Sequence, residues 1–342
     1  MARERIVSAA EQAADAEQAA GALRPGRIDE YVGQRDLVER VRIAIEAARA
    51  RSEPMEHVLL HGPPGLGKTT LAHVIAAEMG TRAYVTSGPA LTKAADLIGT
   101  LTKMQANDVL FIDEIHRLPT AVEEYIYPAM EDFRIDFTVD SGMHSKVVTI
   151  GLRPFTLIGA TTRAGLLTQA LRTRFGISHN LGYYPIDELM TIVARAARLL
   201  GMPELPEPTL RAVSERSRGT PRVALRLLRR VRDFSQVRAK GSLASRVVDD
   251  ALALEGVDAL GLDELDRRYM RTLATTYGGG PAGIEAIAAS VGEDSQTLED
   301  VVEPFLLQAG FLARTRQGRR LTDAAFRHLG IEPPPREGAL YE

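Results

Sequence analysis

Short apolar runs alternate with helical patterns through the first half of the chain. Runs with the length of a buried strand occur at residues 57–61, 83–86, 108–112 and 155–160. Helical patterns separate the first three runs, and a helical pattern over 38–48 precedes the first. This alternation predicts an α/β fold with a mostly parallel, doubly wound sheet, in which 155–160 is the last strand.

Residues 134–150 depart from the alternation. Ile135, Phe137 and Val139 share one face of a strand-like stretch, and polar residues occupy the other face. We expect a β-hairpin that turns at Ser141-Gly142 and is an insertion in the sheet domain.

The second half of the chain is helical in pattern. Helices are expected at 187–200, 209–218 and 221–239, and Thr220 and Pro221 fit the N-cap and first position of the third. From residue 258, helical stretches at 263–276, 283–290 and 295–309 precede two strand-like runs within 311–322. These runs flank a Gln317-Gly318 turn. Three helices followed by a hairpin are typical of a winged helix.

Four regions follow from these patterns. They are an N-terminal arm (1–22), a large α/β domain (23–184), a small helical domain (185–257) and a winged-helix domain (258–342). The arm is predicted to be loose because it is rich in Ala, Gln and charged residues, with little apolar surface to bury.

Composition excludes several classes of protein. The 342 residues carry 42 Lys+Arg and 45 Asp+Glu, so a net charge of −3 excludes a uniformly basic nucleic-acid coat protein. The absence of cysteine excludes disulfides, thiolate metal sites and a cysteine nucleophile. No apolar run approaches the roughly 20 residues that span a bilayer, and acidic residues interrupt the N-terminus where a secretory signal would be apolar. We expect a cytoplasmic protein without a membrane anchor.

The clearest chemical motif is GPPGLGKT at residues 62–69, between a predicted strand and a predicted helix that stops at Gly80. The spacing fits a phosphate-binding loop, whose backbone N–H groups and helix N-terminus hold phosphate oxygens. Lys68 would contact the β- and γ-phosphates, and the Thr69 hydroxyl would be a ligand of Mg²⁺. An ordinary Gly-rich turn is the alternative.

Two carboxylates end the strand at 108–112. Asp113 is then the acid on the Mg²⁺ side, and Glu114 the general base that orients the attacking water. The alternative is a solvated strand end. His116 is assigned no role, since no second histidine stands at metal-binding spacing.

Further polar residues follow the last predicted strand. Thr161 or Thr162 could bond the γ-phosphate or the attacking water, although Thr is also common in strands. Arg172 or Arg174 could reach the nucleotide of another subunit as an arginine finger. Arg222, in the first turn of a helix, could sense phosphates, or it could belong to a solvated basic face.

Arginines gather on the predicted wing at positions 314, 316, 319 and 320, with few acids close by in sequence. Such a wing suits the phosphate backbone or minor groove of duplex DNA, while a solvated basic loop is the alternative. Few aromatic residues are interleaved, which disfavours stacking on single strands.

Five segments together resemble the RuvB family of bacterial branch-migration motors, within the AAA+ ATPases. They are GPPGLGKTT, VLFIDEIHRL, LIGATTRAG, LRTRFGI and GTPRVALRLLRRVRDF, and the resemblance covers about residues 23 to 330. It implies an AAA+ domain, a helical lid and a DNA-binding head that use ATP and Mg²⁺. It also implies hexameric rings that pump double-stranded DNA at a RuvA-bound Holliday junction, with the RuvC resolvase in the wider complex.

The resemblance also implies roles for individual residues. Arg174 becomes the arginine finger, Thr161 the nucleotide sensor, and the 134–150 hairpin the element that docks RuvA. DNA contacts fall on Arg314 and Arg319. Nucleotide contacts fall on Leu23, Arg24, Gly65, Lys68, Thr69, Thr70, Glu131, Asp132, Phe133, Arg174, Tyr184 and Arg222.

Another class of protein joins the same parts for a different purpose. An ATP-dependent switch or loader, such as an initiator or clamp loader, also attaches an AAA+ core to a C-terminal DNA-binding or collar domain. The hairpin together with the arginine wing favours the motor. A protein-unfolding AAA+ subunit is disfavoured, because the chain ends in a basic winged helix.

Overall fold

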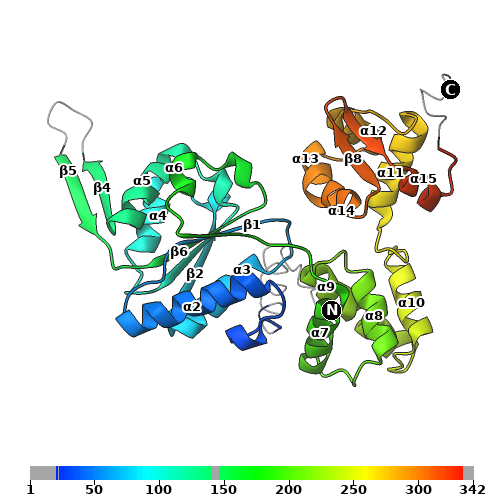
Figure 1. Ribbon diagram of the computed structural model, residues 1–342, viewed down its shortest axis with the longest axis horizontal. Helices are drawn as coiled ribbons and strands as arrows, with labels where there is room; N and C mark the ends of the chain where they lie inside the picture. The colour runs from blue at the N-terminus through cyan, green and yellow to red at the C-terminus, as the bar shows by residue number, and fades with distance from the viewer. Residues whose placement is uncertain (1–20, 22, 140–145, 334–342) are drawn as a thin grey trace, which may run out of the picture. The chain divides into compact units, whose positions relative to one another are not determined.

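The computed structural model describes residue 21, residues 23–139 and residues 146–333. Two compact units make up the chain, Met1–Pro203 and Glu204–Glu342 (Figure 1). The expected arm, apart from Gly21, and the expected Ser141-Gly142 turn lie outside the described residues. No helix in the described ranges is long and apolar enough to cross a membrane.

The first unit is built on a five-stranded parallel sheet with the order β2-β3-β6-β1-β7. The strands are β1 (Val58–His61), β2 (Ala83–Ser87), β3 (Val109–Asp113), β6 (Thr156–Thr161) and β7 (Ile177–Asn180). Every residue of β6 is buried, and so are all but the last residues of β1 and β3. The parallel sheet predicted from the apolar runs is confirmed.

The prediction that 155–160 is the last strand is wrong, because β7 follows it and pairs with β1. Strand β7 has the sequence ISHN, and its residues alternate between half-buried and exposed. An edge strand of this kind lacks the continuous apolar run that marks the buried strands.

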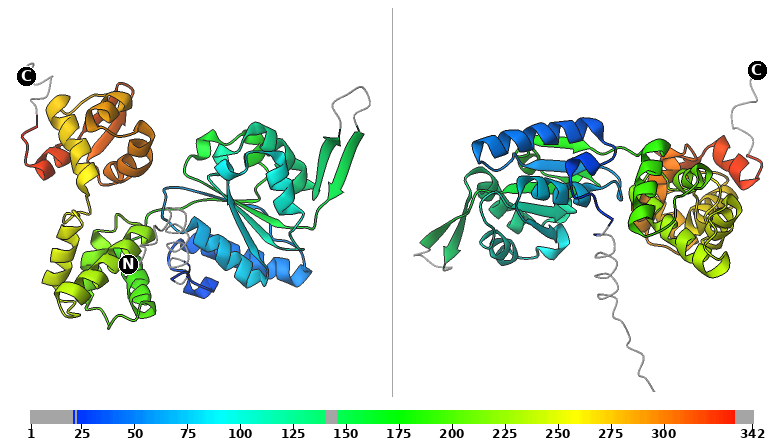
Figure 2. Two further views of the ribbon diagram at one scale, coloured as in Figure 1. Left: turned by 180° about the vertical axis from the view of Figure 1, so that it is seen from behind. Right: turned by 90° about the horizontal axis from the view of Figure 1, so that it is seen from below.

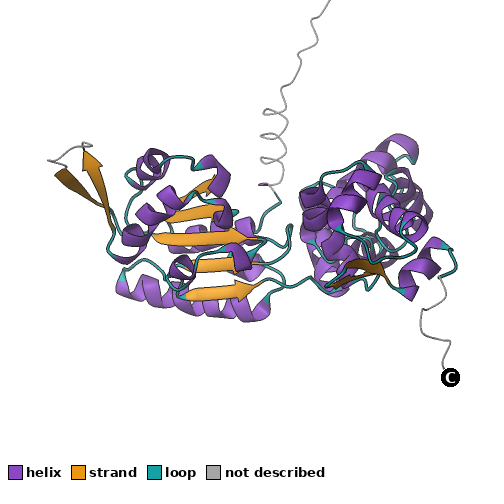
Figure 3. Ribbon diagram, turned by 90° about the horizontal axis from the view of Figure 1, so that it is seen from above, coloured by secondary structure: helices purple, strands orange, loops and turns teal. Residues whose placement is uncertain are grey.

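Helices surround the sheet (Figures 1 and 3). They are α2 (Arg35–Arg51), α3 (Lys68–Met79), α4 (Ala94–Leu101), α5 (Thr120–Glu131) and α6 (Gln169–Arg172). Helix α7 (Ile186–Leu199) follows β7 near the end of the first unit. Short 3₁₀ turns occur at η1 (Ile28–Glu30), η2 (Gly88–Ala90), η3 (Ile115–Arg117) and η4 (Ala164–Leu166). The helix after the phosphate-loop motif ends as expected, since Gly80 takes the left-handed conformation at its C-cap.

The predicted hairpin is confirmed. Strands β4 (Arg134–Val139) and β5 (Lys146–Gly151) pair antiparallel and project from the body of the first unit (Figure 2). Ile135 is fully buried and anchors the base of the hairpin in the core.

The second unit begins with α8 (Glu207–Glu215), α9 (Pro221–Arg238) and α10 (Ser245–Leu254). Helix α8 ends three residues earlier than predicted, and the Ser217 hydroxyl bonds the Val213 carbonyl after the helix end. Thr220 occupies the N-cap position of α9, but its hydroxyl donates to Ser217 O instead of capping the helix. Helix α10 was not predicted.

A winged helix completes the second unit. It contains α11 (Glu264–Thr276), α12 (Ile284–Val291), α13 (Ser295–Thr297), a π-helical turn η5 (Leu298–Val302), α14 (Glu303–Gln308), β8 (Leu312–Thr315), β9 (Gly318–Leu321) and α15 (Asp323–Leu329). Its core includes Leu262, Tyr269, Met270, Leu273, Ile287, Leu298 and Leu306.

Three details differ from the predicted winged helix. The stretch 295–309 is not one helix, because Pro304 has no N–H to continue the bonding and a π-turn precedes it. The wing turn is Arg316-Gln317, since Gly318 already pairs with Thr315. Helix α15 was not predicted.

Candidate functional site

The phosphate-loop motif forms a loop between β1 and α3 whose conformation depends on glycine. Gly62, Gly65 and Gly67 have φ of 132°, 82° and 98°, a region that side chains disfavour. A Cβ at Gly62 would lie 2.6 Å from Leu181 O. Lys68 is buried, and its Nζ donates to the carbonyls of Gly62 and Pro63 at 2.8 Å each. The loop therefore wraps around the lysine that the motif requires.

Two tyrosines, Tyr31 and Tyr184, contact this loop. The Tyr184 hydroxyl donates to Leu66 O at 3.2 Å and lies 3.5 Å from the Tyr31 hydroxyl. A Cβ at Gly67 would lie 2.8 Å from the Tyr31 hydroxyl. Burial raises the pKa of both phenols, so both remain neutral hydrogen-bonding groups. Tyr184 thus lies beside the phosphate loop, and its nucleotide contact stays a prediction.

The predicted acids lie at the carboxyl-terminal edge of the sheet. Asp113 ends β3 and accepts the Glu114 N–H at 2.9 Å, and Glu114 has a φ of 46°. Glu114 Oε2 lies 3.3 Å from the Thr162 hydroxyl and 3.3 Å from His116 Nδ1. The two acids and Thr162 are therefore brought together.

His116, which was given no role from the sequence, links two of the predicted site residues. Its Nδ1 lies 2.8 Å from Thr161 Oγ1 as well as 3.3 Å from Glu114. Thr161 is fully buried, and its hydroxyl also accepts the Arg163 N–H at 3.0 Å. Thr161 therefore holds His116 and the turn after β6, while Thr162 is half-buried beside Glu114.

Arg174 belongs to a separate cluster. Its Nε and Nη2 each lie 3.2 Å from Glu131, Nη1 donates to Ala170 O at 2.7 Å, and the guanidinium lies 4.4 Å from the Tyr127 ring centroid. Glu123 accepts hydrogen bonds from Tyr127 and Thr168, which fixes the ring under the arginine.

This second cluster lies near the amino-terminal edge of the sheet. Ile177 N bonds the carbonyl of His57, the residue just before β1, and His57 Nε2 lies 3.0 Å from Met130 O. Arg174 lies just before Ile177 in the sequence, and Glu131 directly follows Met130. Because all strands are parallel, Lys68, Asp113 and Glu114 lie at the other edge. One chain thus carries two sets of predicted nucleotide residues on opposite edges of one sheet.

The remaining predicted nucleotide residues are placed as follows. Leu23 is buried and Arg24 half-buried, just ahead of η1, which packs on α3. Thr69 and Thr70 lie in the first turn of α3. Asp132 pairs with Arg134 at 3.2 Å, and Phe133 packs edge-on against Phe155 with centroids 5.9 Å apart. Arg222 is exposed in the first turn of α9.

The wing arginines divide into two pairs. Arg314 and Arg319 face each other across β8 and β9, and both bind Glu303, which is fully buried. Arg314 Nη2 lies 2.5 Å and Arg319 Nε 2.9 Å from this carboxylate, while Arg319 Nη2 also lies 2.5 Å from Glu299. Although few acids are near these arginines in sequence, two are near them in space.

Arg316 and Arg320 form the other pair. Both are exposed, and across residues 23–139 and 146–333 neither takes part in an ion pair. The buried Tyr269 hydroxyl donates to Glu303 Oε1 at 2.8 Å and completes the binding of that carboxylate. The wing therefore carries two solvated arginines, Arg316 and Arg320, and two, Arg314 and Arg319, that are fixed by Glu303.

Three family models match the chain. They describe a Holliday junction DNA helicase RuvB P-loop domain (23–181), a RuvB AAA lid domain (184–258) and a RuvB C-terminal winged helix domain (259–330). Together they span most of the sequence in the order of the elements described above.

Similar proteins agree with these matches. The Holliday junction branch migration complex subunit RuvB of Desulfosudis oleivorans is 57% identical over 310 residues, which cover 91% of this chain and 90% of that protein. The RuvB of Myxococcus xanthus is 54% identical over 320 residues, 93% of each chain. The structure of the Thermotoga maritima RuvB Holliday junction branch migration motor matches with a TM-score of 0.84 at 48% identity, covering 92% of this chain and 100% of that one.

Proposed function

The chain belongs to the RuvB family of Holliday junction DNA helicases, and we propose that it hydrolyses ATP to drive branch migration of four-way DNA junctions. Its RuvB P-loop and AAA lid domains make it an AAA+ ATPase. The observation that supports a motor most directly is a single chain that carries this ATPase site, the β4–β5 hairpin and an arginine-bearing wing.

Within one subunit, the carboxyl-terminal edge of the sheet would carry the chemistry. Lys68 would exchange its bonds to two loop carbonyls for the β- and γ-phosphates. Glu114 would polarise the attacking water, and Thr162, whose hydroxyl lies 3.3 Å from it, would report the state of the γ-phosphate. Thr161 would act through His116, which it bonds at 2.8 Å.

The residues present fit a Mg²⁺ ion that is shared with a nucleotide. Thr69 and Asp113 offer a hydroxyl and a carboxylate at one edge of the sheet, and the described residues contain no group of three or more acidic or histidine side chains placed to hold a metal ion by themselves. Mg²⁺ in phosphoryl-transfer sites characteristically takes one or two protein oxygens and completes its shell with phosphate and water. The ion would neutralise charge that develops on the phosphates.

Hydrolysis would also need a neighbouring copy. Arg174 and Glu131 lie near the opposite edge of the sheet from Lys68 and Glu114, so they suit the nucleotide of a neighbour better than their own. Arginine fingers supplied in trans accelerate hydrolysis by roughly 10³–10⁵. This arrangement supports a ring of subunits, which we propose is a hexamer. Leu23, Arg24, Thr70, Tyr184 and Arg222 would complete the nucleotide contacts in each subunit, with Asp132 and Phe133 beside the finger.

Duplex DNA would bind at the wing. The helical stretch 295–308 contains Glu299, Asp300 and Glu303 but no Lys or Arg, so it is poorly suited to enter a groove of DNA. Arg314 and Arg319 would contact the duplex from their buried anchor, and Arg316 and Arg320 would add solvated charge for the phosphates. Contacts of this kind read the backbone and not the sequence.

Partners follow from the same proposal. We propose that the β4–β5 hairpin docks a RuvA protein bound to the junction, because it projects from the first unit and leaves Val148 40% exposed. The RuvC resolvase would act on the same junction in the wider complex. Chromosomal junctions as substrate would place the protein in the cytoplasm.

A strand-separation assay tests this function. The wild type, with ATP and a RuvA protein, should dissociate a synthetic four-way junction, and Glu114→Gln should bind ATP but dissociate none. Hydrolysis and DNA binding without any movement of the junction, even with the partner, would instead favour a switch or loader.

A further inference from the structure

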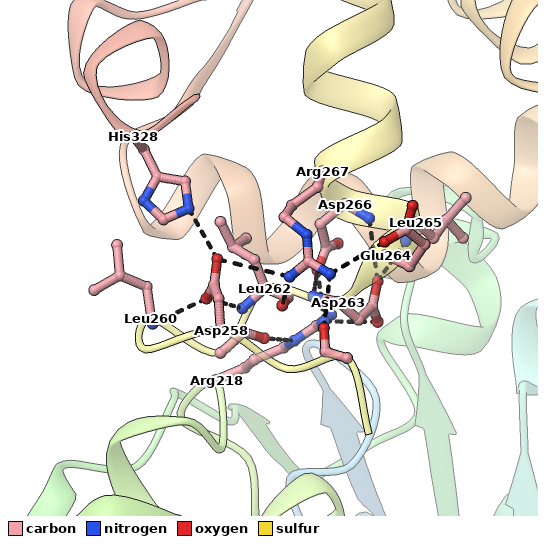
Figure 4. Close-up of polar contacts among 12 residues, drawn as sticks. Arg218, Asp258, Leu260, Leu262, Asp263, Glu264, Leu265, Asp266, Arg267 and His328 are labelled. Carbon is pink, nitrogen blue, oxygen red and sulfur yellow. Dashed lines mark hydrogen bonds and ion pairs between the residues drawn. The ribbon is translucent and has the colours of Figure 1, made fainter. Parts of the chain in front are cut away.

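A cluster of charged side chains joins the helices α8–α10 to the winged helix within the second unit (Figure 4). Arg218, in the turn between α8 and α9, is at its centre, and its side chain is 10% exposed. Its Nε donates to Gly261 O at 2.7 Å, and its Nη2 lies 2.7 Å from Asp263 and 2.5 Å from Asp266. The guanidinium also lies 5.1 Å from the centroid of the Phe305 ring on α14.

The two carboxylates that bind Arg218 also fix the start of α11. Asp263 Oδ1 accepts the N–H groups of Leu265 at 3.0 Å and Asp266 at 3.1 Å. Asp266 Oδ2 accepts the Asp263 N–H at 2.9 Å in return. This reciprocal cap sets the direction of α11. Arg218 therefore binds the atoms that orient the first helix of the winged helix.

The connection between the two groups of helices is also packed. Gly261 has a φ of 84°, and a Cβ there would lie 2.7 Å from Arg216 O. Asp258 Oδ2 lies 2.9 Å from His328 Nε2 on α15. Arg218 and His328 both contact the segment between α10 and α11, Arg218 through Gly261 O and His328 through Asp258 (Figure 4). The segment between α10 and α11 is therefore fixed by contacts at Asp258 and at Gly261.

Burial of this cluster argues against a role in stability alone. Asp266 is fully buried, its Oδ1 has no hydrogen-bond partner among the described residues, and burial raises its pKa to about 7. Buried ion pairs are often no more stable than apolar residues of the same volume. What such a cluster adds is a defined orientation, because charged groups tolerate few alternative arrangements.

Arg218 also lies between Arg222 and the elements that hold the wing. Arg222 follows in the first turn of α9, and the turn that carries Arg218 is closed by bonds from Thr220 N and Oγ1 to Ser217 O at 3.0 and 3.2 Å. On the other side, α14 carries both Phe305 and Glu303, and Glu303 holds the wing arginines. A continuous path of packed and bonded groups therefore runs from Arg222 to the wing.

We propose that Arg218 is a positioning residue that makes helices α8–α10 and the winged helix move as one body, so that nucleotide changes sensed at Arg222 displace the DNA-bound wing. The inference rests on the proposed function, because it takes Arg222 as a nucleotide contact and the wing as the DNA contact. Its structural part, the clamp itself, can be tested without either.

The clamp is tested by a distance measurement. Because the chain has no cysteine, spin labels can be attached at Val237→Cys on α9, where the side chain is 80% exposed, and at Glu285→Cys on α12. The distance distribution should be narrow in the otherwise wild-type chain and clearly broader with Arg218→Met. Arg216→Met is the matched control, since Arg216 pairs at 2.8 Å with Asp249, away from the winged helix. An unchanged width with Arg218→Met would overturn the proposal.

The mechanical consequence is tested on the full motor with a four-way junction and a RuvA protein. Arg218→Met should hydrolyse ATP within about twofold of the wild type but dissociate about tenfold fewer junctions per ATP. Arg216→Met should match the wild type, and Arg218→Lys should recover part of the yield. An equal yield per ATP in Arg218→Met would overturn the coupling.

A second variant keeps both tests valid if the single change unfolds the unit. Arg218→Met leaves buried carboxylates unpaired, whereas Arg218→Met with Asp266→Asn removes one of the charges and keeps an oxygen to accept the Asp263 N–H. This double variant should fold, show a broad distribution and remain uncoupled. A narrow distribution with wild-type yield would refute the proposal. A wild type that moves no junction would refute the proposed function, and the distance measurement would still decide the clamp.

Discussion

Individual buried polar groups connect the ATPase site to its framework, and His57 is the clearest case. Its Nδ1 accepts the Leu157 N–H at 2.9 Å, so the ring is neutral and Nε2–H donates to Met130 O at 3.0 Å. The ring therefore ties β1 to β6 and to the end of α5, one residue before Glu131. Burial lowers the pKa of His57, because the charged ring would lose water and one of these bonds.

The depressed pKa of His57 predicts a dependence of stability on pH. Below pH 6.5, the ordinary pKa of histidine, His57 binds a proton in the unfolded chain but stays neutral in the folded chain. The contribution of His57 to the free energy of unfolding is therefore complete above pH 6.5 and is lost as the pH falls. The wild type should lose unfolding free energy, relative to His57→Asn, between pH 7 and pH 5, by at most about 1.4 kcal/mol per pH unit. Denaturant titrations of both proteins at several pH values measure it, and parallel curves would contradict it.

At the scale of elements, local sequence patterns predict an element correctly where it is a continuous apolar run or where a glycine marks a turn or a helix end. The phosphate loop, the buried strands, the hairpin base and helix α3 follow from residues that are adjacent in sequence. Strand β7 does not, since its position is decided by pairing with β1 and its own residues are half polar. The bonds of His116 to Thr161 and of Arg319 to Glu303 join residues 45 and 16 positions apart, which no local pattern reveals.

The wing shows how such a distant contact changes an expectation. The clustering of the four wing arginines in sequence does not distinguish their surroundings, but Glu303 separates them into an anchored pair, Arg314 and Arg319, and a solvated pair, Arg316 and Arg320. The anchored pair neutralises a buried carboxylate, and removing it leaves that charge unpaired. The two pairs should therefore differ in what their loss does to the protein.

Substitutions in the wing distinguish the two pairs. Arg316→Ala with Arg320→Ala should keep the thermal stability and make the salt dependence of duplex binding shallower, by about 0.9 in slope for each phosphate that an arginine no longer neutralises. Arg314→Ala with Arg319→Ala should weaken binding and also destabilise the second unit by about 3–5 kcal/mol, because Glu303 stays buried. Binding titrations at several salt concentrations, with thermal melts alongside, measure both effects. An unchanged slope in the first variant would remove the solvated pair from the DNA surface.

For the whole molecule, the decisive feature is the distribution of the ATPase residues over two edges of one sheet. Lys68, Asp113 and Glu114 occupy the carboxyl-terminal edge, and Arg174 with Glu131 lies near the amino-terminal edge. Under the proposed function, no single copy would complete its own site, and hydrolysis would be a property of adjacent copies. The same arrangement would let ATP use in one subunit move its neighbour on DNA.

Mixing two inactive variants tests this account most directly. Glu114→Gln keeps a normal Arg174, and Arg174→Ala keeps a normal Glu114, so each alone should hydrolyse ATP at least about a hundredfold more slowly than the wild type. In an equal mixture on a four-way junction with a RuvA protein, some interfaces join a normal Glu114 to a normal Arg174. The account predicts that ATP hydrolysis reappears in the mixture. A mixture as inactive as its two components would contradict an active site shared between neighbouring copies.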